Sequence, residues 1–503
     1  MVRAVTGVVQ RRQFQDIALN ISGIVLPMAA GFLVVPDLIR RLGPEKFGML
    51  SICWMLVGYF GILDLGLGRG LTQYLARQVG SGVRDDVRAA VARRVRRWML
   101  VVGAGWMLLL LCASPLLQTV DLHLAPELQQ EAALGWVVLA MSVPLLMWAS
   151  CSTGVLEAYS HFRAVNAVRV PMGCAVFVVP WLLAHFTQNL AAIIGGLWGV
   201  RLIAALALAG ISREFFDGEH VPQDTAHARG ILTFGGWLTV TNVIGPVIAY
   251  FDRFAIGALI SMAAVTYYTV PFDVLSRLPA LPVAMMGVFF PLLARLHAPA
   301  GADGGRLHKT VGASVRMLYA GWVPLIVLCG VFGPRVLTGW LGADFAAESS
   351  QVWRWLSVGV LLNGFAHVPY ALLHSAGRSD ITAKLHLLEF FPYFGFLWWA
   401  LHAYGITGAA MAWTLRVLVD TLMLYGSAWR LFPVISQLCR NTLMSLAFIT
   451  MAIAAFHHYG YASFAGDGAV AAVAPWMCIL FVWTVYHGRR LFVESHEDFG
   501  NIQ

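Results

Sequence analysis

Apolar runs of roughly twenty residues recur along the whole chain, and this feature constrains the fold more than any other. A helix rises about 1.5 Å per residue, so such runs match a hydrocarbon core about 30 Å thick. Of the 503 residues, 59% are hydrophobic and 12% are charged. A soluble chain would carry about twice that charged fraction, and a β-barrel would show alternating segments of about ten residues. The sequence therefore predicts an all-α, polytopic transmembrane protein.

We predict about fourteen spans from the hydrophobic runs. They lie at 17–40, 47–72, 98–118, 133–157, 164–185, 190–212, 231–258, 264–294, 310–333, 351–375, 381–402, 407–429, 441–459 and 469–488. The most polar stretch of the chain falls after the sixth span and indicates a linker. The predicted parts are an N-terminal six-helix bundle (1–212), a cytoplasmic linker (213–230), a C-terminal six-helix bundle (231–430), and two additional transmembrane helices with a cytoplasmic tail (431–503).

Basic residues alternate between loops in a way that sets the orientation. The loops at 119–132 and 460–468 contain no Lys or Arg, whereas the segment 77–97 is rich in Arg. Cytoplasmic loops carry the excess of positive charge, so we expect both termini in the cytoplasm. The same rule accounts for the formal charge of +8, and we exclude nucleic acid as a partner.

Acidic residues at 85 and 86 precede a basic amphipathic stretch that ends near Trp98. Acid at the start and base at the end suit a helix dipole, so a surface helix is predicted here. Its expected partners are anionic membrane lipids, although a protein partner is an alternative.

Cysteine usage argues against disulfides and metal sites. The seven cysteines fall in predicted spans or in a loop placed in the cytoplasm, and none forms a CxxC or zinc-ligand spacing. No cofactor is indicated.

The segment 47–77 places a carboxylate and an arginine, Asp64 and Arg69, in or beside an apolar span. A carboxylate in hydrocarbon costs roughly 2.5 kcal/mol or more, so it is retained where protein or water meets it. Gly66, Gly68 and Gly70 would let another helix approach closely. Asp64 is therefore either structural, with Arg69 reaching to the interface, or part of a polar passage.

Further charges fall deep in predicted spans, roughly 12–20 Å from the entry. They are Arg201, Asp273, Arg277, Glu389, Arg416 and Asp420. Asp273 with Arg277, and Arg416 with Asp420, have the spacing of neighbours on one helix face. Each set is either a self-neutralised pair or a face that presents Arg to an anionic ligand, since guanidinium matches phosphate oxygens. Charges on several separate helices favour the second interpretation.

Other polar residues of the spans are less specific. Asp252 and Arg253 lie toward the outer half of the seventh span. His367, His374 and His386 lie in or near spans, where a histidine more often joins two helices by a hydrogen bond than relays protons.

Two long segments resemble the polysaccharide-biosynthesis flippases, a lipid-linked oligosaccharide (O-antigen) flippase family of the multidrug/oligosaccharidyl-lipid/polysaccharide (MOP) transporter superfamily. They are PDLIRRLGPEKFGMLSICWMLVGYFGILDLGLGRGLTQYLAR, at 36–77, and LTFGGWLTVTNVIGPVIAYFDRFAIGALISMAAVTYYTVPFDVLSRL, at 232–278. PLLARL at 291–296 and GRSDITAKL at 377–385 are also similar to that family. The resemblance covers essentially the whole chain.

The resemblance implies a V-shaped pair of six-helix bundles around a cationic cavity, as in the MATE and other MOP transporters. It implies alternating access that moves an undecaprenyl-pyrophosphate-linked oligosaccharide or polysaccharide repeat unit from the cytoplasmic to the periplasmic leaflet of the bacterial inner membrane. The positions that match in kind are Asp64, Arg69, Asp252, Arg253, Asp273 and Arg277. Depth alone adds Arg201, Arg416 and Asp420 as substrate-binding candidates.

Two other functions compete with a flippase. A multidrug antiporter of the same fold would be expected to carry mainly acidic cavity residues, but arginines outnumber acids here. A membrane enzyme of polysaccharide assembly would need a large loop or a carboxylate cluster such as DxD, so no enzyme is predicted. The identity and length of the glycan, the coupling ion (H⁺ or Na⁺), any polymerase partner and the oligomeric state stay open.

Overall fold

The computed structural model describes residues 2–60, 64, 66–80, 84–119, 126–217, 250–296 and 304–455. Within these ranges the chain is almost wholly helical and has no β-strand, which confirms the predicted all-α class. Eight helical segments of the described chain are long and apolar enough to cross a bilayer. The chain is therefore a multi-pass membrane protein, and the full number of spans stays a prediction.

The chain forms two compact units, Met1–Thr266 and Tyr267–Gln503. The boundary falls within one helix, α8 (Met262–Leu275). The predicted linker is described only as far as residue 217, and the predicted last span lies outside the described residues. The division into two six-helix bundles and two further spans thus stays a prediction.

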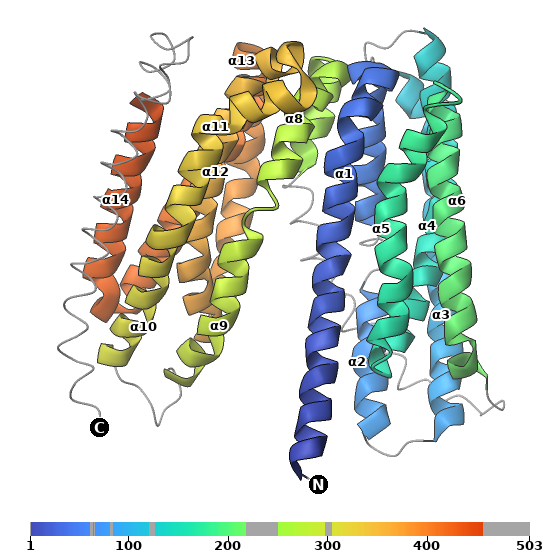
Figure 1. The fold of residues 1–503 in the computed structure, drawn as a ribbon, viewed down its shortest axis with the longest axis horizontal. Helices are drawn as coiled ribbons and strands as arrows, with labels where there is room; N and C mark the ends of the chain where they lie inside the picture. The colour runs from blue at the N-terminus through green and yellow to red at the C-terminus, as the bar shows by residue number, and fades with distance from the viewer. Residues whose placement is uncertain are drawn as a thin grey trace. The chain divides into compact units, whose positions relative to one another are not determined.

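The first unit is built around a long central helix. Its helices (Figure 1) are α1 (Val2–Phe60), α2 (Leu67–Gly80), α3 (Asp85–Thr119), α4 (Pro126–Ala158), α5 (Phe162–Leu183) and α6 (Leu190–Ser212). The central helix α4 packs against α2, α3 and α6, while α1 packs against α5. Residues buried on α4 run along its whole length, as expected for a helix that has neighbours on several sides.

The helix α1 contains the first two predicted spans, joined by a break at Gly43. Gly43 has φ of +78°, a left-handed conformation that favours glycine. A straight helix would separate Gly31 from Trp54 by about 35 Å. Yet a Cβ built on Gly31 would lie 3.3 Å from the Phe177 ring, and Trp54 meets the same ring edge-on at 5.1 Å. The chain therefore turns back between the two spans, as the sequence predicts.

The second unit is organised around α12 (Ala343–Ser375), which packs against α9, α11 and α13. Its other elements (Figure 1) are α9 (Ala280–Leu296), α10 (Gly304–Met317), α11 (Val323–Leu341), α13 (Ser379–Leu431) and α14 (Ser436–Ala455). A short π-helical segment, Leu318–Trp322, joins α10 to α11. Most residues of α12 are buried, so it forms the core of this unit.

The helix α13 is a hairpin of two predicted spans with its turn at Gly405, where φ is +58°. In a straight helix Ala400 and Gly408 would be about 12 Å apart. Instead, a Cβ added to Gly408 would overlap the carbonyl oxygen of Ala400. The two halves therefore run back along each other, and residues equally distant from the turn meet.

Two predicted spans are not continuous helices. The span predicted at 47–72 is broken: α1 ends at Phe60, α2 begins at Leu67, and Gly66 between them has φ of +70°. The span predicted at 264–294 is broken between α8 and α9, at 276–279. Pro279 ends that helix because it has no N–H and disfavours helical backbone at the preceding residue. The second of these segments, Met262–Leu296, is nevertheless long and apolar enough as a whole to cross a bilayer.

The predicted basic helix begins at Asp85, as expected, but it continues directly into the third span as α3. Two of its arginines contact protein: Arg93 Nη1 donates a hydrogen bond to the carbonyl oxygen of Phe216 at 2.6 Å, and the Arg96 guanidinium lies 4.3 Å from the Phe216 ring centre. Phe216 is buried. The basic N-terminal part of α3 therefore packs against the segment that follows α6. Lipid contact by the remaining arginines stays a prediction.

A glycine pair within α13 tests the hairpin. We expect Gly408→Ala to lower the melting temperature of the purified protein strongly, because the new methyl would overlap the backbone at Ala400. Gly395→Ala is the matched control, since its Cβ would meet nothing within 4 Å, and a helical Gly→Ala change stabilises by up to about 1 kcal/mol. Equal melting temperatures for the two variants would contradict the hairpin.

Candidate functional site

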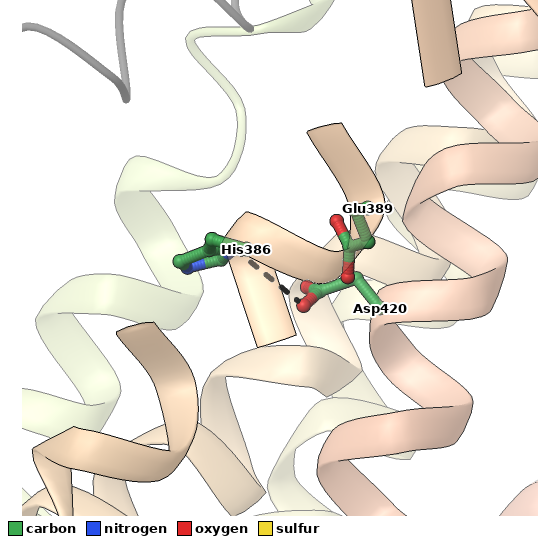
Figure 2. Close-up of side chains that lie close together, drawn as sticks. All are labelled: His386, Glu389 and Asp420. Atoms are coloured by element: carbon green, nitrogen blue, oxygen red, sulfur yellow. Dashed lines mark ion pairs between the residues drawn. The ribbon is translucent and has the colours of Figure 1, made fainter. Parts of the chain in front are cut away.

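The hairpin of α13 brings four charged or titratable side chains together within the second unit. His386 and Glu389 lie on the first half, and Arg416 and Asp420 lie on the returning half. Figure 2 shows the carboxylates of Glu389 and Asp420 close to each other, with His386 beside Asp420. We call these four residues the α13 cluster.

Ion pairs in the α13 cluster cross between the two halves of the hairpin. Arg416 Nε donates to Glu389 Oε2 at 3.3 Å, and Arg416 also lies 5.9 Å from the Tyr393 ring centre. Asp420 Oδ1 lies 3.9 Å from His386 Nδ1, an ion pair when the histidine is protonated. One alternative from the sequence was that Arg416 and Asp420 neutralise each other along one helix, whereas the favoured one was that this face presents Arg to an anionic ligand. The structure instead gives each a partner on the opposite half.

The carboxylates of the α13 cluster are buried and incompletely hydrogen-bonded. Glu389 is 5% exposed and Asp420 is 8% exposed. Within the described residues, Glu389 Oε1, Asp420 Oδ1 and His386 Nδ1 have no hydrogen-bond partner. One donor atom from each of these residues lies within 4.8 Å of the other two. The cluster is therefore shaped to receive a small cation or a proton.

The helix α12 adds further titratable groups next to the α13 cluster. His374 Nε2 lies 3.0 Å from Thr382 Oγ1 of α13, and its ring stacks on Tyr370 at 4.1 Å between ring centres. This hydrogen bond confirms, for His374, the helix-joining role that the sequence favoured. His367 is half-buried on the same helix. None of these groups supplies a fixed charge to oppose the carboxylates.

Arg201 is the exceptional charge of the first unit. It lies midway along α6, about 16 Å from the helix start, and is 8% exposed. Arg201 Nη1 donates a long, weak hydrogen bond to the Leu197 carbonyl oxygen at 3.5 Å. Among the described residues no carboxylate lies within 4 Å of its guanidinium. A buried guanidinium of this kind is suited to an anionic ligand.

Asp64 is held by neighbouring helices at the break before α2. Asp64 Oδ1 accepts a hydrogen bond from the Gly66 backbone N–H at 2.8 Å, and Oδ2 accepts one from Ser150 Oγ of α4 at 2.9 Å. A Cβ on Gly68 would lie 2.5 Å from Ser150 Oγ, and one on Gly154 would lie 2.9 Å from the Gly68 carbonyl oxygen. The predicted close helix approach at Gly68 is confirmed, and these bonds give Asp64 a structural role.

The other predicted site residues differ in exposure. Arg69 is exposed on α2, in line with the alternative that it reaches to the interface. Asp252 and Arg253 are both buried, and Arg253 Nη1 meets Asp252 Oδ1 at 3.2 Å while stacking 4.7 Å from the Tyr250 ring centre. This pair is neutralised internally, so much of its charge is already satisfied.

Asp273 and Arg277 do not share one α-helix. Asp273 belongs to α8, which ends at Leu275, and Arg277 lies in the following turn. Both side chains are exposed in the second unit, and their part in substrate binding stays a prediction.

Sequence reasoning noted the depth of Glu389 and the position of His386 but did not include them among the binding residues. Their spacing, i and i+3, with Tyr393 one turn further, places all three on one helix face. That pattern was the sequence signal for a cluster of titratable groups. It could not identify the partner helix, because the pairing with Arg416 and Asp420 depends on the turn at Gly405.

Several spans joined by tight turns, with ionisable side chains buried inside each unit, define a polytopic membrane protein of the kind that handles polar solutes. Comparison with known proteins narrows this class. The chain matches the family described as polysaccharide biosynthesis protein over residues 14–297, more than half its length. The chain belongs to this family.

Individual relatives agree with that assignment. A putative O-antigen transporter of Shigella flexneri is 28% identical over 407 residues, covering 80% of this chain and 95% of the relative. An inward-facing multidrug resistance MATE family transporter of the MOP superfamily has a TM-score of 0.64 at 15% identity, covering 83% of this chain and 99% of the other. The lipid II flippase MurJ, in an inward closed conformation, has a TM-score of 0.63 at 11% identity, covering 96% and 99%. The two structural likenesses establish a shared fold.

Substitutions at the α2 break test the structural role of Asp64. We expect Asp64→Ala to lower the stability of the purified protein by roughly 1–3 kcal/mol, because Ser150 and the Gly66 N–H lose their acceptor in a buried site. Arg69→Ala, at an exposed position five residues on, is the control and should leave thermal unfolding unchanged. Equal unfolding curves for Asp64→Ala and wild type would show that the carboxylate does not hold this break.

Proposed function

We propose that this protein is a flippase for a lipid-linked glycan. It moves an undecaprenyl-pyrophosphate-linked oligosaccharide or polysaccharide repeat unit from the cytoplasmic to the periplasmic leaflet by alternating access. Membership of the polysaccharide biosynthesis family supports this proposal, as does the similarity to a putative O-antigen transporter. The shared fold with a lipid II flippase and with a multidrug transporter supports a transport role over an enzymatic one.

The observation that carries the proposal is Arg201. A buried cation without a carboxylate partner costs several kcal/mol, so an internal structural role does not explain why this position holds arginine. A pyrophosphate group would meet the guanidinium through paired hydrogen bonds and remove that cost. Arg201 is therefore our first candidate for contact with the substrate's phosphates.

The substrate's chemistry explains why a protein is needed. Each unsatisfied sugar hydroxyl in hydrocarbon costs kilocalories, so a glycan cannot cross lipid unaided at a useful rate. Polar side chains within the spans would replace its hydration, while its lipid tail stays in the bilayer. The other predicted binding residues stay candidates for supplying these polar side chains: Asp64, Arg69, Asp252, Arg253, Asp273, Arg277, Arg416 and Asp420.

The membrane location, topology and partners of the protein are part of the same proposal. We place it in the bacterial inner membrane with both termini in the cytoplasm, because the basic loops then face inward. Its partners are the lipid-linked glycan, membrane lipids, a coupling ion, and the polymerase that would use the delivered repeat unit.

Leaflet location of the lipid-linked glycan in cells depleted of this protein tests the function. We expect the glycan to accumulate on the cytoplasmic leaflet and wild type to restore its export. Normal export together with altered sensitivity to cationic dyes would favour a drug antiporter. A glycan left unassembled or unpolymerised would favour an enzyme.

A substitution of similar volume tests Arg201. We expect Arg201→Met to abolish rescue in the leaflet assay while leaving the melting temperature unchanged or higher, because it removes an uncompensated buried charge. Arg169→Met is the control: its side chain is 52% exposed and pairs with Glu157 at 3.0 Å, so rescue should persist. Full rescue by Arg201→Met at normal protein level would refute contact with the phosphates.

A further inference from the structure

The charges of the α13 cluster do not balance. Glu389 and Asp420 supply two carboxylates, and they are the buried carboxylates of the second unit within its described part. Arg416 offsets one of them through its ion pair with Glu389. Two carboxylates this close cannot both ionise cheaply in a buried site. The cluster therefore has room for one more positive charge.

Among the described residues, the elements packed against α13 do not supply that charge. The helix α13 packs against α12 and α14. The titratable groups of α12 beside the cluster are His367, Tyr370 and His374, and none carries a fixed charge. The described part of α14 contributes Cys439 and Arg440 and no carboxylate, and Arg440 bonds to Gln437 on its own helix. On α13 itself, His386 and Tyr393 complete the surroundings.

A proton suits the two carboxylates of the cluster better than a metal ion does. It carries the single positive charge that neutralises the cluster, and a proton between Glu389 Oε1 and Asp420 Oδ1 would give both oxygens their missing hydrogen bond. Hard cations prefer an all-oxygen shell, whereas here one of the three donor atoms is His386 Nδ1.

Arg416 has spare capacity to bind a second anion. It reaches Glu389 through Nε, so its pair with that carboxylate is not the two-pronged contact that guanidinium can form. Its side chain is 17% exposed, whereas that of Glu389 is 2% exposed. The guanidinium is thus the accessible member of the pair.

We propose that Glu389 and Asp420 together hold one exchangeable proton, and that Arg416 couples this site to substrate by leaving Glu389 for the phosphates of an anionic ligand. Glu389, deprived of its counter-charge, then takes a second proton from water. Anion binding and proton uptake therefore promote each other equally, as linkage requires. The coupling step rests on the proposed function, because it needs an anionic substrate, whereas the proton site does not.

Binding of inorganic pyrophosphate to the purified full-length protein in nanodiscs tests the coupling. We expect wild type to take up close to one more proton per bound pyrophosphate than Glu389→Gln does. The comparison with this variant is needed because pyrophosphate itself changes protonation on binding. The dissociation constant should rise about tenfold more per pH unit for wild type than for Glu389→Gln. Asp380→Asn, an exposed carboxylate at the start of α13, is the matched control and should behave as wild type.

Arg416→Met should weaken pyrophosphate binding at least tenfold and remove the proton uptake. If Glu389→Gln keeps the wild-type pH dependence, or if Arg416→Met binds pyrophosphate as wild type does, the coupling is refuted. Failure of wild type to bind pyrophosphate also refutes it. If pyrophosphate binding depended on Na⁺ and not on pH, and Glu389→Gln removed that dependence, the site would bind sodium and the proton site would be refuted.

Infrared difference spectra after a pH step test the proton site without substrate. Wild type should show a protonated-carboxyl C=O band that Glu389→Gln and Asp420→Asn each remove and Asp380→Asn retains. A spectrum unchanged by both cluster variants, with melting temperatures near wild type, refutes the site. The leaflet assay separates the two proposals: failure of wild type to restore export refutes the flippase and leaves this band unaffected.

Discussion

The cost of removing a charge from water governs where every ionisable side chain of these spans can lie. In hydrocarbon, a charge is retained where hydrogen bonds or an opposite charge meet it. Asp64 obtains two hydrogen bonds from Gly66 and Ser150, and Arg253 obtains the carboxylate next to it. These positions satisfy the requirement internally. Arg201 and the α13 cluster do not, so they are the first candidates for ligand binding.

Glycines at a few backbone positions allow the chain to bring these partners to its buried charges. The left-handed turn at Gly405 folds α13 back on itself and brings Glu389 to Arg416, although 27 residues separate them. The break at Gly66 frees backbone N–H groups at the start of α2, where Asp64 accepts one of them. In both places the charge chemistry follows from the backbone geometry, because a continuous helix would hold these groups apart.

The sequence was sufficient to predict the class and the approximate positions of most described spans, because hydrophobic length and helical rise determine both. It was insufficient for the pairing. Local spacing placed Arg416 and Asp420 one turn apart but could not identify the partner that the hairpin gives each of them across the turn. For Asp273 and Arg277 the spacing assumed one continuous helix, but α8 ends at Leu275. Local periodicity cannot specify the contacts that the second half of a helical hairpin makes with the first.

The unsatisfied charges of the two units have opposite sign. Within the described part of the first unit, Arg201 is a buried guanidinium with no carboxylate within 4 Å, whereas in the second unit Glu389 and Asp420 share an excess carboxylate charge. On the proposed scheme one proton balances the α13 cluster of the empty protein, whereas the cost at Arg201 remains until an anion binds there. An anion that draws Arg416 from Glu389 without a second proton raises the cost at the cluster. The same electrostatics that make these residues expensive would therefore favour conformational change in the fully loaded protein over change in the half-loaded one.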